Sequence, residues 1–463
     1  MTPELTRRLF LGTAAACCRP AAAADSLRED ALAALHKAVE FYRTRVGVRG
    51  GYVYYTSLDL TERWGEGKAA ADVAFVQPPG TPTVGAAYLR AFAATKDRFY
   101  LDAAQETAAT LAAGRLKSGG WAQTFVIAPG AKPKDGNSSL DDNQTQSALA
   151  FLADCDQALD FKHAAIHSAA VDGLDALLKA QFPNGAFPQV FRGPAAKQPL
   201  AKATYPEYDW RTEGRVKNYW DYYTLNDGLC GTVAATLVRA AEVYGEKRFT
   251  AALAWLGDFL LAAQMPDPQP AWCQQYNYEM LPIWARKFEP PAITGSESQD
   301  AMETLITIAR RTGGAKYLEP IPRALDYFTE RCLLPDGRVA RFYELRTNKP
   351  LYMNAQYELT YDDSAAPSHY GWKQSQRFER IRRAHAAAAA DLKPEPVPPR
   401  RVSAAEVRRV VDELDAEGRW VSVYAGEGLT GQPKFANGFR YLSSAVFSRN
   451  IEMLSAFLAD AGR

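Results

Sequence analysis

The stretch YLDAAQETAATLAAGRLKSGGWAQTF, Tyr100 to Phe125, contains the pattern that decides the fold. Its first part places apolar residues at steps of three and four as far as Leu116, which is typical of an amphipathic helix. A glycine pair begins at Gly119, and a short segment of aromatic and amide side chains follows it. We therefore predict a helix that ends in a turn and a short extended strand.

This turn and strand recur along the whole chain, each time after an amphipathic segment. Six stretches are alike: GGYVYYT from Gly50, GGWAQTF from Gly119, GAFPQVF from Gly185, PAWCQQY from Pro270, GRVARFY from Gly337 and GRWVSVY from Gly418. Further apolar segments with helical periodicity lie between them, at about 83–94, 144–159, 228–244, 299–311, 374–390 and 438–461. The sequence therefore predicts about twelve helices in six pairs.

A single helical pair cannot bury its own apolar face, so consecutive pairs must pack side by side. Six pairs favour an all-α fold, a closed or nearly closed toroid of helical hairpins similar to an α/α barrel. The alternative is an irregular helical bundle. In a toroid, the loops that enter the inner helices meet at one end, where we expect the functional site. The predicted domain covers residues 25–463, and the alanine- and proline-rich segment 385–402 is typical of a linker before the last pair.

The composition and net charge of the chain argue against some classes of binding partner. The chain has 463 residues, 47% of them hydrophobic and 23% charged, with a net charge of +1. That near neutrality argues against a broad basic surface, so we expect no nucleic acid partner. The 23 tyrosines and 9 tryptophans include enough aromatic side chains to line a sugar-binding surface, although most should lie in the core.

The N-terminal segment TRRLFLGTAAACCRPAAAADS resembles an export signal. It has a twin-arginine pair, Arg7 and Arg8, then a short apolar run and small residues that suit cleavage after Ala24. The run is too short to span a bilayer, and we expect no transmembrane segment. The prediction is a signal peptide over residues 1–24 and export by the twin-arginine or the general secretory route. A lipid anchor at Cys17 or Cys18 is a less favoured alternative.

Four cysteines remain beyond this segment, and they are widely scattered without a CxxC pair, which argues against a zinc site. We expect buried free thiols at Cys155, Cys230, Cys273 and Cys332. The five histidines fall mostly in predicted helices, so a Ser-His-Asp triad has little support. No Gly-rich phosphate loop follows a strand.

Two loops place acidic and amide residues directly before inner helices. AKPKDGNSSLDDNQTQ contains Asp141, Asp142 and Asn143, and RVKNYWDYYTLNDGL contains Asn226 and Asp227. Such residues often act as helix caps, since their side chains accept hydrogen bonds from free backbone N–H groups. Two such sets before successive inner helices can instead converge as oxygen ligands for a hard cation such as calcium.

A third loop, WCQQYNYEMLPIWARKFEPP from Trp272, carries Arg286 between aromatic and proline residues. A plain core helix has no need of this mixture, which points to chemistry at a cation. The structural alternative is that Arg286 pairs with Glu289 or Glu297.

Several motifs in order, SLDDNQTQSALAFL, NGAFPQVF, TLNDG, the stretch from Trp272 to TGSES, and ARFYELRTNKP, resemble the pectate lyases of polysaccharide lyase family 10. The resemblance covers residues 119–372. It implies a helical toroid that cleaves polygalacturonate or a related acidic polysaccharide by calcium-dependent β-elimination. It also implies Asp142, Asn143 and Asp227 as calcium ligands, Arg286 as the base and Arg341 as a substrate-binding residue.

Other candidates for substrate contact lie in the same motifs: Trp284, Asn226, Tyr276 and Asn277. The last two are departures, because the family usually has a histidine and an aspartate at these positions. A second substrate arginine is expected after Arg341, where this chain has MNAQY with Ala355 at its centre. These departures leave open whether the substrate changes or the activity is lost.

Two other functions fit the same fold. An inverting glycoside hydrolase of the toroid class would use Asp142 and Asp227 as its carboxylate pair, separated by about 6.5–9.5 Å. A non-catalytic glycan-binding homologue would keep the fold without the reaction. We expect a monomer in each case.

Overall fold

The computed structural model describes residues 19–128, 130, 133–368, 370–395 and 400–460, with side chains from residue 26 onward. Twelve α-helices lie within these residues, as the sequence predicts. Arg7, Arg8, Cys17 and Cys18 lie outside the described residues. The predicted cleavage point at Ala24 lies inside the first helix, which begins at Arg19.

The even-numbered helices form one packed series in the order α12, α2, α4, α6, α8 and α10. Their bounds are α2 Thr81–Thr95, α4 Gln144–Ala158, α6 Leu229–Tyr244, α8 Gly295–Thr312, α10 Phe378–Ala390 and α12 Ser444–Asp460. The odd-numbered helices flank this series: α1 Arg19–Phe41, α3 Arg98–Ala113, α5 Ala164–Ala180, α7 Lys247–Ala263, α9 Ile321–Arg331 and α11 Ala404–Asp412. This arrangement is an all-α toroid of six hairpins, and it confirms the predicted fold class.

The turn that follows an odd-numbered helix packs against the next helical pair. At Gly185 (φ 92°), an added methyl group would come 1.8 Å from the carbonyl oxygen of Trp255 in α7. At Gly418 (φ 90°), it would come 2.8 Å from the carbonyl oxygen of Lys37 in α1, so the last pair joins the first. Only glycine allows both the backbone angle and the close approach.

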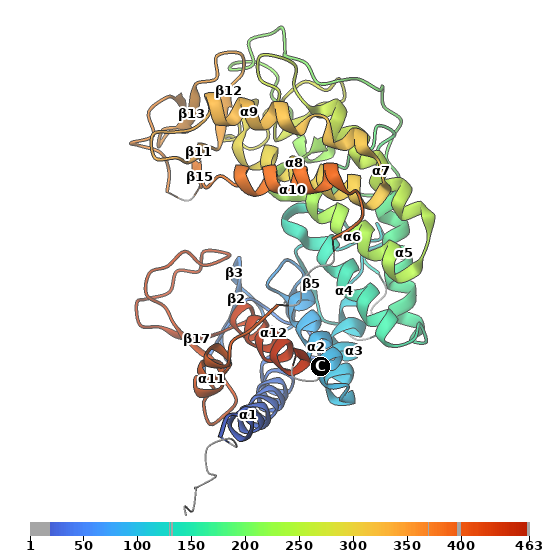
Figure 1. Cartoon of the computed structure of the whole chain (residues 1–463), viewed down its shortest axis with the longest axis vertical. Coiled ribbons are helices and arrows are strands. Elements are labelled where there is room, and N and C mark those ends of the chain that lie inside the picture. Colours follow the sequence, from blue (N-terminus) through green and yellow to red (C-terminus); the bar gives the residue numbers. More distant parts are fainter. Residues whose placement is uncertain (1–18, 129, 131–132, 369, 396–399, 461–463) are drawn as a thin grey trace, which may run out of the picture.

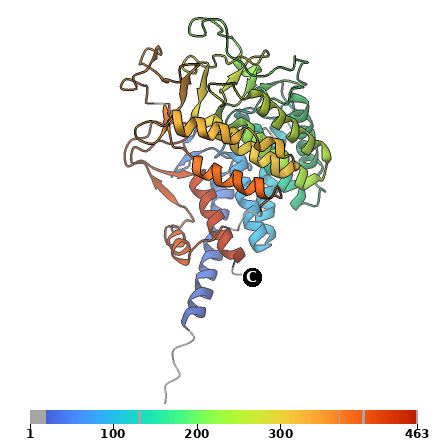
Figure 2. The same ribbon diagram turned by 45° about the horizontal axis from the view of Figure 1, so that its top comes forward.

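The fifth turn differs from these. Gly337 has the same positive φ (77°), but nothing lies within 4 Å of its missing side chain. Figure 1 shows the reason: α11 and α12 lie beside α1 and apart from α10, and Figure 2 again shows α1 and α12 together. The fifth and sixth pairs therefore do not pack against each other as the other consecutive pairs do.

The predicted strands form small antiparallel sheets at the end where the loops enter the even-numbered helices. One sheet has the order β16-β17-β1-β2-β3 and another the order β10-β12-β13-β14, with two-stranded pairs β4-β5, β6-β7, β8-β9 and β11-β15. Their bounds are β1 Tyr55–Ser57, β2 Arg63–Gly65, β3 Gly67–Lys68, β4 Val73–Phe75, β5 Thr124–Val126, β6 Ser138–Ser139, β7 Val190–Phe191, β8 Tyr223–Thr224, β9 Gln275–Tyr276, β10 Ala292–Thr294, β11 Val339–Ala340, β12 Phe342–Glu344, β13 Pro350–Met353, β14 Leu359–Thr360, β15 Lys373–Gln374, β16 Val421–Val423 and β17 Arg440–Ser443.

One hydrophobic cluster runs through all twelve helices, and a smaller aromatic one lies under the sheet that contains β1. The four predicted thiols are buried and free, as expected. The alanine run at 386–390 completes α10 instead of starting a linker, because alanine is the strongest helix former. Among the described residues, no helix combines the length and apolarity that a membrane span requires.

Candidate active site

Two equivalent turns lead into α4 and α6. The turn η2 (Asp141–Asn143) and the turn η4 (Asn226–Gly228) each place their second residue in the left-handed region, Asp142 at φ 44° and Asp227 at φ 52°. Neither turn caps its helix through a side-chain hydrogen bond. The acidic side chains are thus free for another role, and because α4 and α6 are neighbours, the two turns lie in contact.

Carboxylates from both turns form a compact acidic cluster. One oxygen each from Asp141, Asp142 and Asp227 lies within 4.8 Å of the others. Burial, followed by the charge of Asp227, raises the pKa of Asp141 to about 6. Asp142 is partly exposed to solvent, yet the loss of hydration around its carboxyl, followed by the charges of Asp141 and Asp227, raises its pKa to about 7. The charge of Arg286 opposes both shifts, but burial and the neighbouring carboxylates outweigh it.

The donor set fits a hard divalent cation. All the converging groups are oxygens, which calcium prefers, and no histidine or cysteine is among them. Two buried amide oxygens beside the cluster, Oδ1 of Asn226 and Oε1 of Gln144, have no hydrogen-bond partner among the described residues. Buried polar atoms usually have partners, so these orphans favour a further ligand at this point. Asn143 follows Asp142 directly, also at positive φ (60°).

Arg286 faces the cluster from the loop before α8. Glu289 holds its guanidinium in a two-pronged ion pair, with Nε 2.8 Å from Oε2 and Nη2 2.8 Å from Oε1. The same Nη2 lies 3.5 Å from Oδ2 of Asp227. Glu289 is only 1% exposed, so this pair fixes the orientation of Arg286 from beneath.

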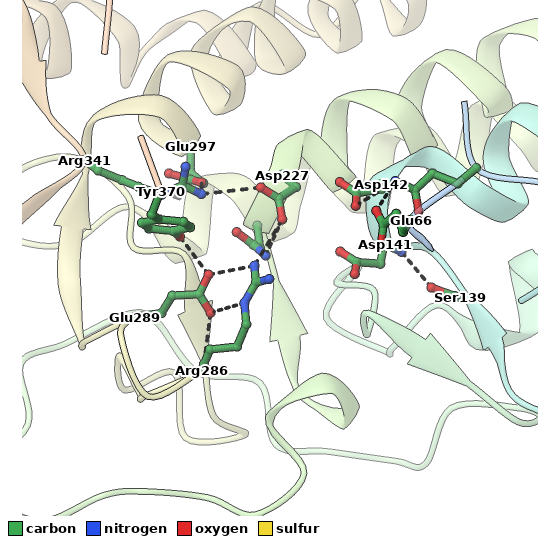
Figure 3. Close-up of polar contacts among 12 residues, drawn as sticks. Glu66, Ser139, Asp141, Asp142, Asp227, Arg286, Glu289, Glu297, Arg341 and Tyr370 are labelled. Carbon is green, nitrogen blue, oxygen red and sulfur yellow. Dashed lines mark hydrogen bonds and ion pairs between the residues drawn. The ribbon is translucent and has the colours of Figure 1, made fainter. Parts of the chain in front are cut away.

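A second arginine approaches Asp227 from the other side. Nη2 of Arg341 lies 3.4 Å from both Oδ1 of Asp227 and Oε1 of Glu297, and its guanidinium stacks 4.3 Å from the ring of Tyr370. The hydroxyl of Tyr370 donates to Glu289 at 2.8 Å, which links the two arginines. Figure 3 shows Asp227 between this network and the acidic cluster.

The charges around Arg286 oppose the effect of its burial on its pKa. An apolar setting would lower its pKa, and burial does act in that direction. The hydrogen bonds and charge of Glu289, with the charge of Asp227, outweigh burial and raise the pKa of Arg286 above its usual range. Similar partners raise the pKa of Arg341 in spite of its burial. Both arginines are therefore held as cations.

The remaining sequence candidates occupy different positions. Asn226 lies in the site and donates from Nδ2 to Asp227 at 2.7 Å. Trp284 is buried beneath the guanidinium of Arg215, which lies 3.8 Å from the centre of its ring. Asn277 shapes a turn, because its Oδ1 accepts from two backbone N–H groups that follow it.

Tyr276 does not join the site, contrary to the sequence prediction. Its side chain is 0% exposed, and its hydroxyl donates to the carbonyl of Ala263 and accepts from the N–H of Cys273, each at 2.7 Å. Tyr343 makes the same pair of contacts one repeat later, with Cys332 and Ala340. Both tyrosines end the repeated stretch, and this equivalence was a sequence signal for a structural role.

Comparison with known proteins gives one family. The pectic acid lyase family model matches residues 127–336, a segment that includes Asp142, Asp227 and Arg286. A search of curated proteins gave no match.

Solved structures with a similar fold include the family 10 polysaccharide lyase from Cellvibrio cellulosa, at 19% identity over 67% of this chain and 96% of that chain, with a TM-score of 0.48. A mutant of this lyase in complex with trigalacturonic acid gives 19% identity over 67% of this chain and 97% of that chain, with a TM-score of 0.47. Cellobiose 2-epimerase from Bacillus thermoamylovorans gives 13% identity over 94% and 100%, with a TM-score of 0.49.

Over residues 127–336, somewhat less than half of the chain, the protein is similar to the pectic acid lyase family. The match supports a pectate lyase-like enzyme. This confirms the resemblance that the sequence motifs suggest.

Proposed function

We propose that this protein cleaves a polygalacturonate-like acidic polysaccharide by β-elimination, with calcium as cofactor and Arg286 as base. The observation that carries the proposal is the position of Asp227. Its carboxylate lies within 4.8 Å of the carboxylates of Asp141 and Asp142 and within 3.5 Å of the guanidinium groups of Arg286 and Arg341. Asp227 is thus in contact with both the proposed cation site and the two arginines that would bind anions.

Asp141, Asp142, Asn143 and Asp227 would hold the calcium ion. When bound, calcium would neutralise the uronate carboxylate and so make the neighbouring C–H bond more acidic. Arg341 is buried at the edge of the site and would hold a substrate carboxylate through its planar guanidinium. Glu289 and Tyr370 would keep Arg286 in a fixed orientation toward the substrate.

Arg286 would take the proton from the carbon next to the carboxylate. The electron pair of that C–H bond forms a double bond in the sugar as the bond to the glycosidic oxygen breaks, and the departing oxygen takes a proton from water. This step requires a neutral guanidine, whereas Glu289 holds the group as a cation. Moving the protonation equilibrium by about four pKa units costs about 5 kcal/mol. We therefore expect turnover to rise steeply with pH into the alkaline range.

The two alternatives are less well supported. An inverting hydrolase places its carboxyl groups about 6.5–9.5 Å apart to admit a water molecule. Oxygens of Asp142 and Asp227 lie within 4.8 Å, which is too close for that arrangement. A non-catalytic binding protein would have no need of an arginine fixed beside the cation cluster by a buried glutamate.

The deciding experiment incubates the purified protein with a small panel of uronate polymers, with calcium and with excess chelator. We expect an unsaturated product with ultraviolet absorbance in calcium only. New reducing ends without this absorbance would support hydrolysis. Binding without either product would support the non-catalytic alternative, and full activity in chelator would remove calcium from the mechanism.

We further propose export through the signal segment, with the mature protein acting outside the cytoplasm as a monomer. Replacing Arg7 and Arg8 by lysine should leave unprocessed protein in the cytoplasm, since the twin-arginine pair is read by its transport route. Normal export of that variant would favour the general secretory route. Light scattering of the mature protein tests the monomer.

A further inference from the structure

A fourth carboxylate stands beside the acidic cluster, and it comes from a part of the chain outside the matched segment. Glu66 occupies the tip of the β2–β3 hairpin, between Gly65 and Gly67, and its residue is exposed. Figure 3 shows it next to Asp142. The hairpin belongs to the sheet that the first and last helical pairs build together.

Gln77 connects this hairpin to the cluster. Its Nε2 donates to Oε1 of Glu66 at 2.9 Å and to Oδ2 of Asp142 at 3.2 Å. Its Oε1 accepts from the amides of Gln123 at 2.8 Å and Gln144 at 3.3 Å. Gln77 is 4% exposed, so a rotation of its amide would break four hydrogen bonds inside the protein. The amide nitrogen of Gln77 therefore has a fixed position between two carboxylates.

A buried hydroxyl at the same place has no partner. Tyr54 is 0% exposed, and its hydroxyl makes no hydrogen bond among the described residues. Burial raises the pKa of Tyr54, and the charges of Glu66 and Asp142 raise it further, which shows that the phenol lies within electrostatic reach of both. An unsatisfied buried hydroxyl costs about 1–3 kcal/mol unless a ligand or its water completes it.

We propose that Glu66 and Gln77 are part of the cation site. Gln77 is a positioning residue that orients the carboxylate of Asp142, and Glu66 adds a negative charge that strengthens the attraction for a divalent cation. This inference rests on the cation binding of the proposed function and deepens it. If it is right, the sheet that the first and last helical pairs form contributes to the cation site. The other proposed ligands of that site all lie in the matched segment 127–336.

The two residues should differ in the size of their effect. Hydrogen-bonded partners of metal ligands typically change metal affinity by about 10–100-fold. Gln77 is such a partner, and it is buried. Glu66 acts through its charge from an exposed position, where salt screens the interaction, so its effect should be a few-fold and should shrink as ionic strength rises.

The test measures binding of calcium alone, by calorimetry, to the mature protein without substrate. Terbium(III) serves as a second probe, because its luminescence can be excited through a nearby aromatic side chain such as Tyr54. We compare the wild type with Gln77→Met, which keeps the length of the side chain without its amide, and Glu66→Gln. The matched control is Glu62→Gln on the same hairpin, where the carboxylate pairs with Lys68 at 2.6 Å.

We expect calcium affinity to fall about tenfold or more in Gln77→Met and a few-fold in Glu66→Gln, the latter mainly at low salt. Glu62→Gln should bind as the wild type does. Thermal melting in excess chelator shows whether each variant is folded. If Gln77→Met is unfolded, the calcium affinity of Glu66→Gln, which changes an exposed residue, tests the inference instead.

Equal affinities in the wild type, Gln77→Met and Glu66→Gln would overturn this inference and leave the cation proposal standing. A wild type that binds neither calcium nor terbium would overturn the cation proposal, and this inference with it. A loss in Glu62→Gln equal to that in Glu66→Gln would reduce the effect to general surface charge and would also overturn the role of Glu66.

Discussion

The two sides of the candidate active site meet at Asp227 and differ in how their charges are balanced. On the arginine side, buried carboxylates face guanidinium groups: Glu289 pairs with Arg286 at 2.8 Å, and Glu297 lies 3.4 Å from Arg341. On the acidic side, neither Asp141 nor Asp142 forms an ion pair with a lysine or arginine among the described residues.

The pKa values follow this difference. Burial would raise the pKa of Glu289, yet the hydrogen bonds and charge of Arg286 lower it. Burial and like charges raise the pKa of Asp141 to about 6 and of Asp142 to about 7 without a comparable opposing partner. Glu297 is intermediate, since burial raises its pKa to about 7 in spite of Arg341. The arginine side is thus balanced by pairs within the protein, whereas in the proposed function a cation balances the acidic side.

The largest effect should come from the centre of the arginine side. Arg286→Lys keeps a positive charge but loses the planar group that Glu289 holds at two points. A base displaced by about 1 Å can cost a hundredfold. We expect turnover to fall at least that much with the Michaelis constant little changed, measured as the rate of unsaturated product formation.

The matched control for this variant is Lys287→Arg, on the neighbouring exposed residue, which should keep normal turnover. Near-normal turnover in Arg286→Lys would remove Arg286 from the chemistry. A lower melting temperature with substantial residual turnover would favour a structural role for the pair with Glu289.

Glu289→Gln tests whether the pairing itself matters. The change removes the charge that raises the pKa of Arg286, so that pKa should fall. If Arg286 is the base, the rise of turnover with pH should move to lower pH by about one unit, equivalent to about 1.4 kcal/mol. Tyr370→Phe removes one hydrogen bond to Glu289 but keeps its charge, so its pH profile should move less than that of Glu289→Gln. An unshifted profile in Glu289→Gln would contradict the assignment of the base.

Arg341→Ala should separate binding from chemistry on the same side. Its guanidinium is available to a substrate carboxylate only at the edge of the site, where its loss should raise the Michaelis constant about tenfold, or about 1.4 kcal/mol. Turnover at saturating substrate should change little, which is the reverse of the pattern expected for Arg286→Lys. A large loss of turnover with an unchanged Michaelis constant would place Arg341 in the chemistry.

The sequence predicts most of the fold, because helical periodicity and glycine turns are local signals. Each repeated stretch does end in a strand, and each even-numbered helix lies close to its predicted range. The looser junction beside Gly337 could not be predicted, because it depends on which neighbour is absent and the local sequence resembles that of the packed junctions. The alanine run after His385 falls in both the predicted helix at 374–390 and the predicted linker at 385–402, and the structure places it in the helix.

In the site, too, local motifs could be predicted from the sequence and contacts between distant segments could not. Asp142, Asp227, Arg286 and Arg341 lie together because their loops enter the toroid at one end. Contacts between distant segments had no local signal: Tyr370 reaches Glu289 across 81 positions, and Gln77 reaches Asp142 across 65. Such pairs follow from packing and not from spacing, so sequence motifs alone could not assign them.

The smallest expected effect is a change in the thermal stability of the protein in chelator, when Asp142 on the acidic side is replaced. Because the pKa of Asp142 is raised, the folded protein binds a proton there more tightly than the unfolded chain does. The stability from this group is therefore present at low pH and is lost as the pH rises through about 7. Asp142→Asn mimics the protonated form at every pH. In chelator at about pH 8 it should melt higher than the wild type by about 2 °C, near 1 kcal/mol for a carboxylate partly in contact with solvent.

The difference should shrink toward about pH 5, where the wild-type carboxylate is protonated in the folded state. In excess calcium the order should reverse, since the asparagine is a weaker ligand than the carboxylate. Asp135→Asn, at an exposed carboxylate paired with Lys117, is the control and should show neither trend. Calorimetry at the two pH values, with chelator and with calcium, measures the melting temperatures of the wild type and both variants. A lower melting temperature for Asp142→Asn in chelator would mean that the acidic side is already balanced without a cation, and the contrast between the two sides would then be wrong.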